Sequence, residues 1–241
     1  MTPQFLNVEE VAEYLHLPVA DILHRVNYRE IPFEKRGHRF VFNKDEIEAW
    51  ASQRILKMPD QRLTEYHQQS THGTREILPH QTMLPELIQA SSIELALPAK
   101  TKASVLRDLV ALAQGTGLLN DPKALLESLE AREELCPTAM PGGFALPHPR
   151  SHEPYLFERS FIVVGRTLQE IHFGAPDGQP TQLFFLICCQ DDRLHLHTLT
   201  RLCHMFQKTA LLGQIQAATD AGQVYEAIIA AEQAVLPGVQ H

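Results

Sequence analysis

The 241-residue chain has only four cysteines, and none of them forms a Cys-x-x-Cys pair. This pattern is typical neither of a disulfide framework nor of a zinc ribbon, and it favours a reducing, cytoplasmic setting. Long hydrophobic runs are also lacking. The most apolar stretch covers residues 183–189, whereas a membrane-spanning helix needs about 20 residues. The N-terminus shows no signal-peptide pattern, so we expect no membrane insertion.

Basic residues are fewer than acidic residues. The chain has 21 Lys and Arg against 29 Asp and Glu, which gives a net charge of −8. Such a balance repels polyanions overall and gives no support to non-specific nucleic-acid binding, although it leaves room for a local basic patch. Hydrophobic residues make up 44% of the chain, which is ordinary for a globular protein.

The composition and apolar periodicity of the sequence change twice along the chain. Residues 1–53 show a compact pattern of helix signals and one hairpin signal, and residues 54–82 are polar with little apolar periodicity. We interpret residues 54–82 as a linker or a loosely packed helix. Residues 83–233 alternate helical and strand-like patterns and are expected to form one domain, followed by a tail at 234–241.

The first stretch predicts two short helices joined by a tight turn. Asn7 with Glu10 three residues later suits a helix start with a returning carboxylate, and Leu17-Pro18 breaks the helix. A second helix follows over residues 19–26, which gives a helix-turn-helix arrangement. Residues 33–42 predict a hairpin turning at Gly37, and a third helix is expected over about residues 44–52.

These residues resemble the excisionase-like, MerR-related winged helix-turn-helix family. The resemblance is carried by residues 8–12, 31–32, 37, 39–42 and 45–50. It implies that the second helix enters a DNA major groove and that the hairpin wing lies along the backbone. The cationic candidates for DNA contact are Arg25, Arg29, Lys35, Arg36 and Arg39. Residues 1–54 nevertheless hold seven Lys and Arg against nine Asp and Glu, so a module kept for protein contact is the alternative.

In the second half, helices are predicted from Lys102 and from Asp121-Pro122, where proline stands at the first helical position. Residues 160–166 and 182–189 read as buried strands, and helices take over from Leu194. Strands interleaved with helices indicate an α/β fold, with a central mixed sheet flanked by helices in three layers.

Three ordered motifs lie in this half, at residues 132–150, 171–180 and 195–202. They resemble enzyme IIA of the bacterial phosphotransferase system, in the mannitol, fructose and nitrogen-regulatory class, over about residues 83–233. The resemblance implies that His148 accepts a phosphoryl group from a histidine phosphocarrier protein. His195 would then hydrogen-bond the phosphate, with Arg132, Thr138 and the backbone near Gly143 in support.

The chemistry suits these residue types, because a neutral imidazole nitrogen is a nucleophile at physiological pH. The other ring nitrogen must be held by an acceptor to fix the tautomer. The loop before His148 departs from the family. Residues 139–143 read Ala-Met-Pro-Gly-Gly in place of the common Gly-Ile-Gly-Asn-Gly, and Pro141 removes one backbone donor. No nucleotide-binding loop is present, so ATP is not the expected donor.

A metal site is the competing explanation for thirteen histidines. His148 and His152 are four residues apart, but Pro149 argues against a helical pair, and His195 and His197 would point about 200° apart on a helix. We therefore expect neither a metal nor a cofactor. The remaining histidines are interpreted as surface or structural residues, namely His67, His72, His80, His172 and His204.

Three functions remain open at this point. The first is a regulatory phosphocarrier, a phosphohistidine phosphotransferase whose output passes through the N-terminal module. The second is a DNA-binding transcription regulator controlled by phosphorylation of His148, and the third is a non-catalytic adaptor. The expected partners are a histidine phosphocarrier protein and either DNA or a regulated protein, and homodimerisation is left open.

Overall fold

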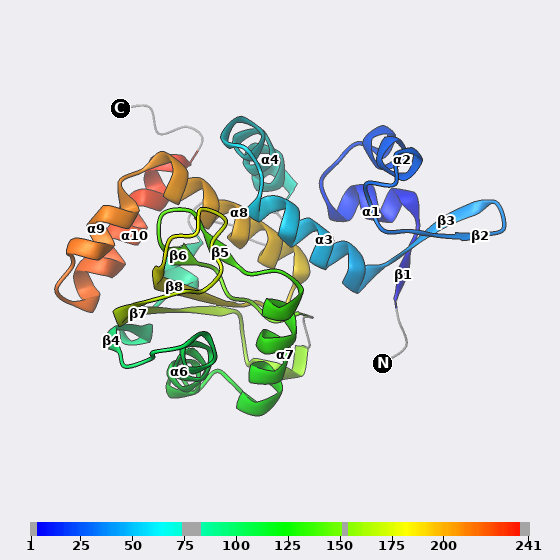
Figure 1. The fold of residues 1–241 in the computed structure, drawn as a ribbon. Coiled ribbons are helices and arrows are strands. Elements are labelled where there is room, and N and C mark those ends of the chain that lie inside the picture. Colours follow the sequence, from blue (N-terminus) through cyan, green and yellow to red (C-terminus); the bar gives the residue numbers. More distant parts are fainter. Residues whose placement is uncertain (1–3, 74–82, 151–153, 237–241) are drawn as a thin grey trace.

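A computed structural model describes residues 4–73, 83–150 and 154–236. We call residues 4–73 the N-terminal module and residues 83–236 the C-terminal domain. The module begins with a winged helix-turn-helix whose hairpin projects away from the rest of the molecule (Figure 1). Its elements are β1 (Phe5–Leu6), α1 (Val8–Tyr14), α2 (Val19–Asn27), β2 (Glu34–Arg36), β3 (Arg39–Asn43) and α3 (Lys44–Leu56).

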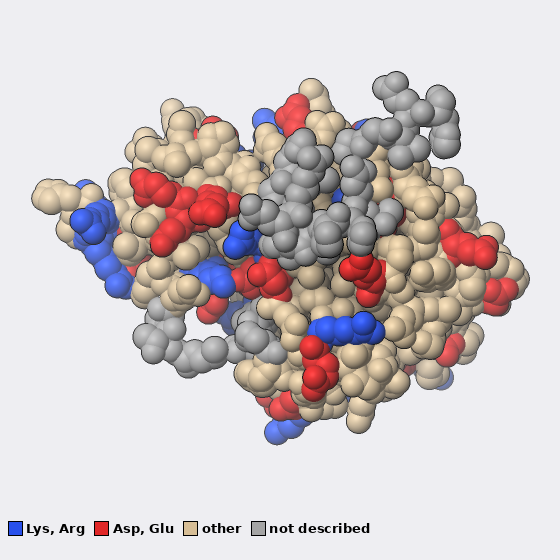
Figure 2. Space-filling model, turned by 180° about the vertical axis from the view of Figure 1, so that it is seen from behind, with Lys and Arg blue, Asp and Glu red and all other residues tan. Residues whose placement is uncertain are grey.

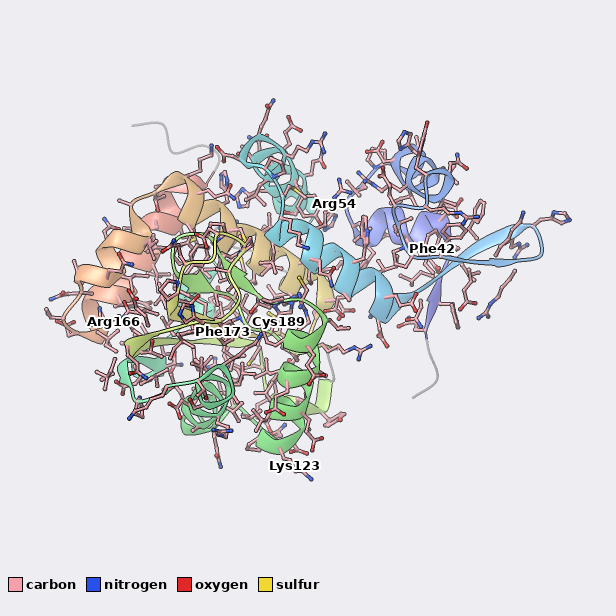
Figure 3. The ribbon with its side chains drawn as sticks, viewed as in Figure 1. Phe42, Arg54, Lys123, Arg166, Phe173 and Cys189 are labelled. Carbon is pink, nitrogen blue, oxygen red and sulfur yellow. The ribbon has the colours of Figure 1, made fainter. Side chains whose placement is uncertain are left out.

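Local sequence signals set the boundaries of these elements. The Glu10 backbone N–H donates to the Asn7 side chain at 2.9 Å, and the Asn7 N–H donates to the Glu10 carboxylate at 2.7 Å. This confirms the expected helix start. The predicted hairpin is also confirmed, with Gly37 at φ +64° in its turn. Phe42 is fully buried and anchors the wing to the module's core (Figure 3).

The polar stretch that follows is largely helical in its described part. Helix α3 continues to Leu56, and α4 covers Asp60–Gly73. Residues 74–82, which include His80, lie outside the described residues, as does the side chain of His72. Helix α4 packs against α8 of the C-terminal domain, so this part of the expected linker or loose helix has a defined place in the fold.

The C-terminal domain is built on a five-stranded sheet in the order β4-β7-β8-β6-β5. Parallel and antiparallel pairs both occur, which confirms the mixed sheet. The strands are β4 (Ile93–Leu97), β5 (Ala139–Met140), β6 (Phe144–Ala145), β7 (Phe161–Ile171) and β8 (Thr181–Cys188). The helices are α5 (Leu84–Leu87), η1 (Ala90–Ser92), α6 (Lys102–Gly115), α7 (Pro122–Leu135), η2 (Pro154–Leu156), α8 (Asp192–Lys208), α9 (Leu211–Ala217) and α10 (Ala221–Val235).

Alternation along β7 and β8 creates the three layers that the sequence predicts. Val163 and Phe184 face α6 and α7 on one side, whereas Ile162 and Phe185 belong to the core shared with α8 and α10 on the other (Figure 1). Burying each such side chain stabilises the fold by about 1.5–3 kcal/mol. Gly165 is needed where β7 passes β4, because an added Cβ would lie 2.4 Å from Leu97.

The core on the α8 side continues without a break into the N-terminal module. Buried residues of the module, such as Val11, Ile47 and Ile55, belong to the same hydrophobic cluster as Leu199 and Val224. Helices α3 and α4 both lie against α8 (Figure 1). The module is therefore packed onto the C-terminal domain. In the part of the chain that the structure describes, we find no helix with the length and apolarity to cross a membrane.

Candidate active site

His148 stands just beyond the end of β6. The chain there is held on both sides, because the Ile187 N–H donates to the Pro147 carbonyl at 2.9 Å and the Leu146 N–H donates to the Thr138 carbonyl at 3.2 Å. Strands β6 and β8 are parallel, so their carboxyl ends lie at the same edge of the sheet. Helix α8 starts shortly after β8, and its first turn places the His195 ring 4.7 Å from the His148 ring, centroid to centroid.

Hydrogen bonds fix the tautomer of His148. Its Nδ1 lies 2.8 Å from the Leu146 carbonyl oxygen, which can only accept, so Nδ1 carries the proton. Arg132 Nε donates to His148 Nε2 at 3.1 Å. Because a guanidinium only donates, Nε2 must be unprotonated. The ring is therefore held neutral with a lone pair on Nε2, which is the form that a nucleophile requires.

Arg132 reaches His148 from the last turn of α7, and its side chain is only 1% exposed. Its Nη1 donates to the Cys136 carbonyl at 2.7 Å. Its Nη2 is buried and makes no hydrogen bond within the described residues. Burial lowers the pKa of Arg132, and the nearby carboxylates of Glu133 and Glu48 partly oppose this shift. Arg132 thus contacts His148 Nε2 and carries, on the same guanidinium, a buried N–H donor without a hydrogen-bond partner among the described residues.

The two residues expected to bind phosphate contact the scaffold, Thr138 through its hydroxyl and N–H and Gly143 through its carbonyl. The Thr138 hydroxyl and N–H both donate to the Glu133 carboxylate, which also pairs with Lys102 at 2.9 Å. Gly143, at φ +91°, accepts from the Gln182 N–H at 3.0 Å, and an added Cβ would lie 3.2 Å from the Pro180 carbonyl. The contacts of both residues are with the surrounding scaffold rather than with the His148 ring.

Three residues of α3 that the sequence reasoning missed lie at this site. Lys44, Glu48 and Ser52 are spaced by four along α3 and therefore share one face. Lys44 forms an ion pair with Asp192 at the start of α8, and Ser52 Oγ lies 3.4 Å from His195 Nε2. Glu48 is 4% exposed and lies close enough to Arg132 to raise its pKa. Only the four-residue spacing of polar groups in a buried helix could have signalled this face.

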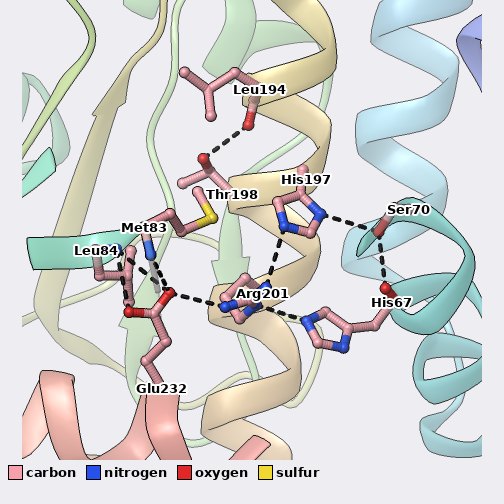
Figure 4. A network of polar contacts seen from close by, with 9 residues as sticks. All are labelled: His67, Ser70, Met83, Leu84, Leu194, His197, Thr198, Arg201 and Glu232. Carbon is pink, nitrogen blue, oxygen red and sulfur yellow. Dashed lines mark hydrogen bonds and ion pairs between the residues drawn. The ribbon is translucent and has the colours of Figure 1, made fainter. Parts of the chain in front are cut away.

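A second polar cluster lies further along α8, on the side that meets α4 (Figure 4). Arg201 donates through Nε to His67 Nε2 at 2.6 Å, through Nη2 to His197 Nε2 at 3.2 Å and through Nη1 to Glu232 at 2.8 Å. Ser70 Oγ lies 3.1 Å from His197 Nδ1. Glu232 also accepts from the backbone of Met83 and Leu84. This cluster ties α4, α8, α10 and α5 together.

The histidines of this cluster are structural, as expected for His67 and His204. Burial lowers the pKa of His67 to about 2 and that of His197 to about 3, with the positive charge of Arg201 as the next cause. Both rings are therefore neutral. His204 stacks on His67 with 4.8 Å between ring centroids. Within the described residues, we find no group of three or more His, Cys, Asp or Glu arranged to hold a metal ion.

A cavity of about 760 Å³ lies between α2, α3 and α4, away from His148. Trp50 lines it, with the Arg25 and Arg54 guanidinium carbons 5.9 Å and 5.3 Å from its ring centroid. The Trp50 Nε1–H donates to the Glu30 carbonyl at 2.6 Å. Arg25 also pairs with the Glu30 carboxylate at 3.3 Å. Arg25, a candidate for DNA contact, thus contacts Trp50 and Glu30 of its own module.

The other cationic candidates lie near or on the wing. Arg29, Lys35, Arg36 and Arg39 are exposed, and Arg36 pairs with Glu34 at 2.9 Å. Figure 2 shows basic side chains behind the tip of the wing and acidic side chains on the neighbouring surface. Helix α1 carries exposed Glu9, Glu10 and Glu13. Of these candidates, Lys35, Arg36 and Arg39 lie on the hairpin and Arg29 follows α2.

The fold and the paired histidines define a class of protein. Residues 86–231 match the family model for the phosphoenolpyruvate-dependent sugar phosphotransferase system, EIIA 2, and residues 5–55 match a helix-turn-helix domain model. The chain belongs to this EIIA family and carries an N-terminal helix-turn-helix domain. Both resemblances predicted from the sequence are therefore confirmed.

Two relatives are each similar to this chain over 60% of its length. The nitrogen regulatory protein of Bradyrhizobium diazoefficiens is 29% identical over 148 residues, which are 60% of this chain and 94% of that protein. The fructose-specific EIIABC component of the phosphotransferase system of Bacillus subtilis is 26% identical over 147 residues. These are 60% of this chain but only 23% of that much longer protein.

Solved structures show the same fold. The nitrogen regulatory protein IIA-Ntr of Neisseria meningitidis matches with a TM-score of 0.54 and 24% identity, covering 61% of this chain and 99% of that one. IIA mannitol of Escherichia coli matches with a TM-score of 0.52 and 20% identity, covering 58% of this chain and 98% of that one. The C-terminal domain therefore has the architecture of phosphotransferase-system IIA proteins.

Proposed function

We propose that this protein is a regulatory phosphocarrier that accepts a phosphoryl group on Nε2 of His148 from a histidine phosphocarrier protein. The observation that carries this proposal is the fixed tautomer of His148, with its proton on Nδ1 facing Leu146 and its lone pair on Nε2 facing Arg132. Membership of the EIIA family supports the same reaction class. We place the protein in the cytoplasm, where such a donor operates.

The transfer balances without any further reactant. The lone pair of His148 Nε2 gives up its hydrogen bond with Arg132 Nε and forms the new N–P bond, while the ring keeps its proton on Nδ1. The N–P bond of the donor's phosphohistidine breaks, and the donor ring, protonated on its other nitrogen, leaves with the electron pair as neutral imidazole. Catalysis of such a step consists of alignment and of stabilising the charge on the moving phosphoryl oxygens. Arg132 supplies its unpaired Nη2 donor, and the neighbouring His195 imidazole supplies a second donor to the phosphoryl oxygens.

Reconstitution with phosphoenolpyruvate, enzyme I and a histidine phosphocarrier tests the proposal. We expect acid-labile phosphate on the full chain and none on His148→Ala. His172→Ala is the matched control, because His172 is an exposed histidine of the same domain. Equal labelling of the parent and of His148→Ala would show that another residue is the acceptor.

The output of the relay belongs, in this proposal, to the N-terminal module, which lies against α8 at the site itself. DNA binding is the second candidate function, supported by the projecting wing with exposed Lys35, Arg36 and Arg39. The wing points away from the C-terminal domain (Figure 1), so it is accessible while the module is packed on α8. Duplex DNA binding that weakens steeply with salt, and that is lost in Lys35→Ala/Arg39→Ala, would support this function.

A further inference from the structure

The N-terminal module closes the candidate phosphorylation site. His148 is 2% exposed and His195 is fully buried. In-line transfer brings the reacting atoms to within about 3–3.5 Å of each other, so a donor protein must insert its own phosphohistidine beside His148 Nε2. Among the described residues, α3 lies across the start of α8 beside this point, with Ser52 against His195 and Lys44 paired to Asp192, and His148 offers almost no exposed surface for that approach.

The closure is built from specific contacts along the whole of α8. Lys44, Glu48 and Ser52 of α3 face its first turns. His67 and Ser70 of α4 contact Arg201 and His197 in its middle, and Asp60 pairs with Lys208 at its end. Apolar residues of both parts join in one core. These contacts identify the occupant of the α8 surface as the chain's own helices α3 and α4.

We infer that this packing is an autoinhibitory contact, in which the N-terminal module and the phosphodonor compete for the same surface around His148. This inference rests on the proposed function, since it concerns the regulation of the same site. Phosphorylation then requires the module to leave α8. By linkage, phosphorylation of His148 weakens the packing of the module by the same factor by which the packed module disfavours the phosphorylated state at equilibrium.

The charges near His148 determine how phosphorylation shifts the competition between the module and the donor. The carboxylate of Glu48 is 4% exposed beside Arg132, and that of Asp192 is 8% exposed at the start of α8. A phosphoryl group on His148 Nε2 would add negative charge near Glu48 and form hydrogen bonds with Arg132, which lies beside both. Like charges in a poorly solvated site repel strongly. Phosphorylation thus converts a closed module into a released one, and release is the signal that downstream partners detect.

The test compares initial phosphorylation rates of full-length variants under the reconstituted relay. Lys44→Glu replaces the ion pair with Asp192 by a repulsion, and Ser52→Leu adds bulk against His195. The two variants open the contact by different means. We expect each to be labelled about 5- to 30-fold faster than the parent, the range that a partly buried contact of this kind provides. Lys44→Glu/Asp192→Lys should return toward the parental rate.

Lys123→Glu is the matched control, because Lys123 is an exposed lysine at the outer end of α7, far from α3 (Figure 3). It should be labelled at the parental rate. Small-angle X-ray scattering should show a larger radius of gyration for the two open variants, and for the phosphorylated parent, at unchanged helix content. Open variants labelled no faster than the parent would overturn the autoinhibition while leaving the phosphocarrier intact. Absence of label on every variant would overturn both.

Discussion

Two buried arginine–histidine pairs lie on opposite sides of α8, and they differ in what surrounds the arginine. In both, an arginine Nε donates to a histidine Nε2: Arg132 to His148, and Arg201 to His67. Arg201 has all three of its nitrogens engaged, one of them with the buried carboxylate of Glu232. Arg132 keeps Nη2 without a hydrogen-bond partner within the described residues.

We interpret the Arg201–His67 pair as structural and the Arg132–His148 pair as suited to the proposed chemistry. The network around Arg201 stabilises the packing of α4, α8 and α10, because each of its guanidinium nitrogens has a partner. An unpaired buried donor costs free energy in the resting protein, and this cost is recovered when an anion arrives. The same residue types thus hold the fold together at Arg201 and, in the proposed function, leave a donor for phosphate at Arg132.

Removing Arg201 should have the largest effect on stability. Arg201→Met leaves Glu232 buried without its cation, so we expect the free energy of unfolding of the C-terminal domain to fall by about 3–5 kcal/mol. Urea unfolding followed by circular dichroism measures this loss. Arg201→Met/Glu232→Gln should recover part of it, because the amide oxygen can still accept from Met83 and Leu84. If the free energy of unfolding of Arg201→Met lay within about 1 kcal/mol of that of the parent, the contrast between the two arginine–histidine pairs would be contradicted.

Removing Arg132 should act on chemistry rather than on stability. Arg132→Gln takes away a charged donor beside Nε2, so we expect the rate of His148 phosphorylation to fall about 100-fold, or about 2.7 kcal/mol. Quenched-flow labelling measures this rate. Arg201→Met, assayed under conditions where it is folded, should be labelled no more slowly than the parent, because the contacts it removes hold α4 on α8 rather than act on His148. Equal slowing of both variants would mean that the two pairs play the same part.

Lowering the pH should weaken the contact between α4 and α8 that includes His67, His197 and Arg201. Burial holds the pKa of His67 at about 2 and that of His197 at about 3, against 6.5 for an exposed ring. The separated helices therefore bind more protons below pH 6.5, so the contact has its full stability above that pH and loses it as the pH falls. We expect the α4–α8 contact to weaken by about 1.5 kcal/mol between pH 7.5 and pH 6.0.

Hydrogen exchange of the α4 amides at the two pH values, corrected for intrinsic rates, measures this weakening. The charged and titratable groups that act on the two rings are Arg201, His204 and His16. His67→Gln/His197→Gln removes the titrating rings while keeping hydrogen-bonding side chains, so its α4 protection should be independent of pH over this range. Unchanged protection in the parent would show that the rings stay shielded after the helices part.

The C-terminal fold and the proximity of three site residues could be predicted from the sequence, because both depend on local patterns and on the order of the motifs. Asn7 with Glu10 marks a helix start, β7 and β8 are continuous apolar runs, and motif order brings Arg132, His148 and His195 together. Strands β4 and β5 were missed. Strand β5 has only two residues, so it presents too short a pattern.

The packing of the module on α8 could not be predicted, because it depends on the match between distant surfaces. Helix α4 has little apolar periodicity, and polar partners such as His67 and Ser70 anchor it instead. Glu48 and Ser52 read as ordinary solvent-facing residues until α8 is placed over them. Sequence reasoning therefore predicted which three residues meet at the candidate site and missed the residues of α3 that lie against it.

Trp50 gives the molecule a built-in optical probe. It is the chain's only tryptophan, it lies on α3, and its hydrogen bond to Glu30 and its two guanidinium neighbours all belong to the N-terminal module. Its surroundings travel with the module when α3 leaves α8. Its fluorescence maximum should thus stay constant during rigid-body release and shift to the red only when the module itself melts.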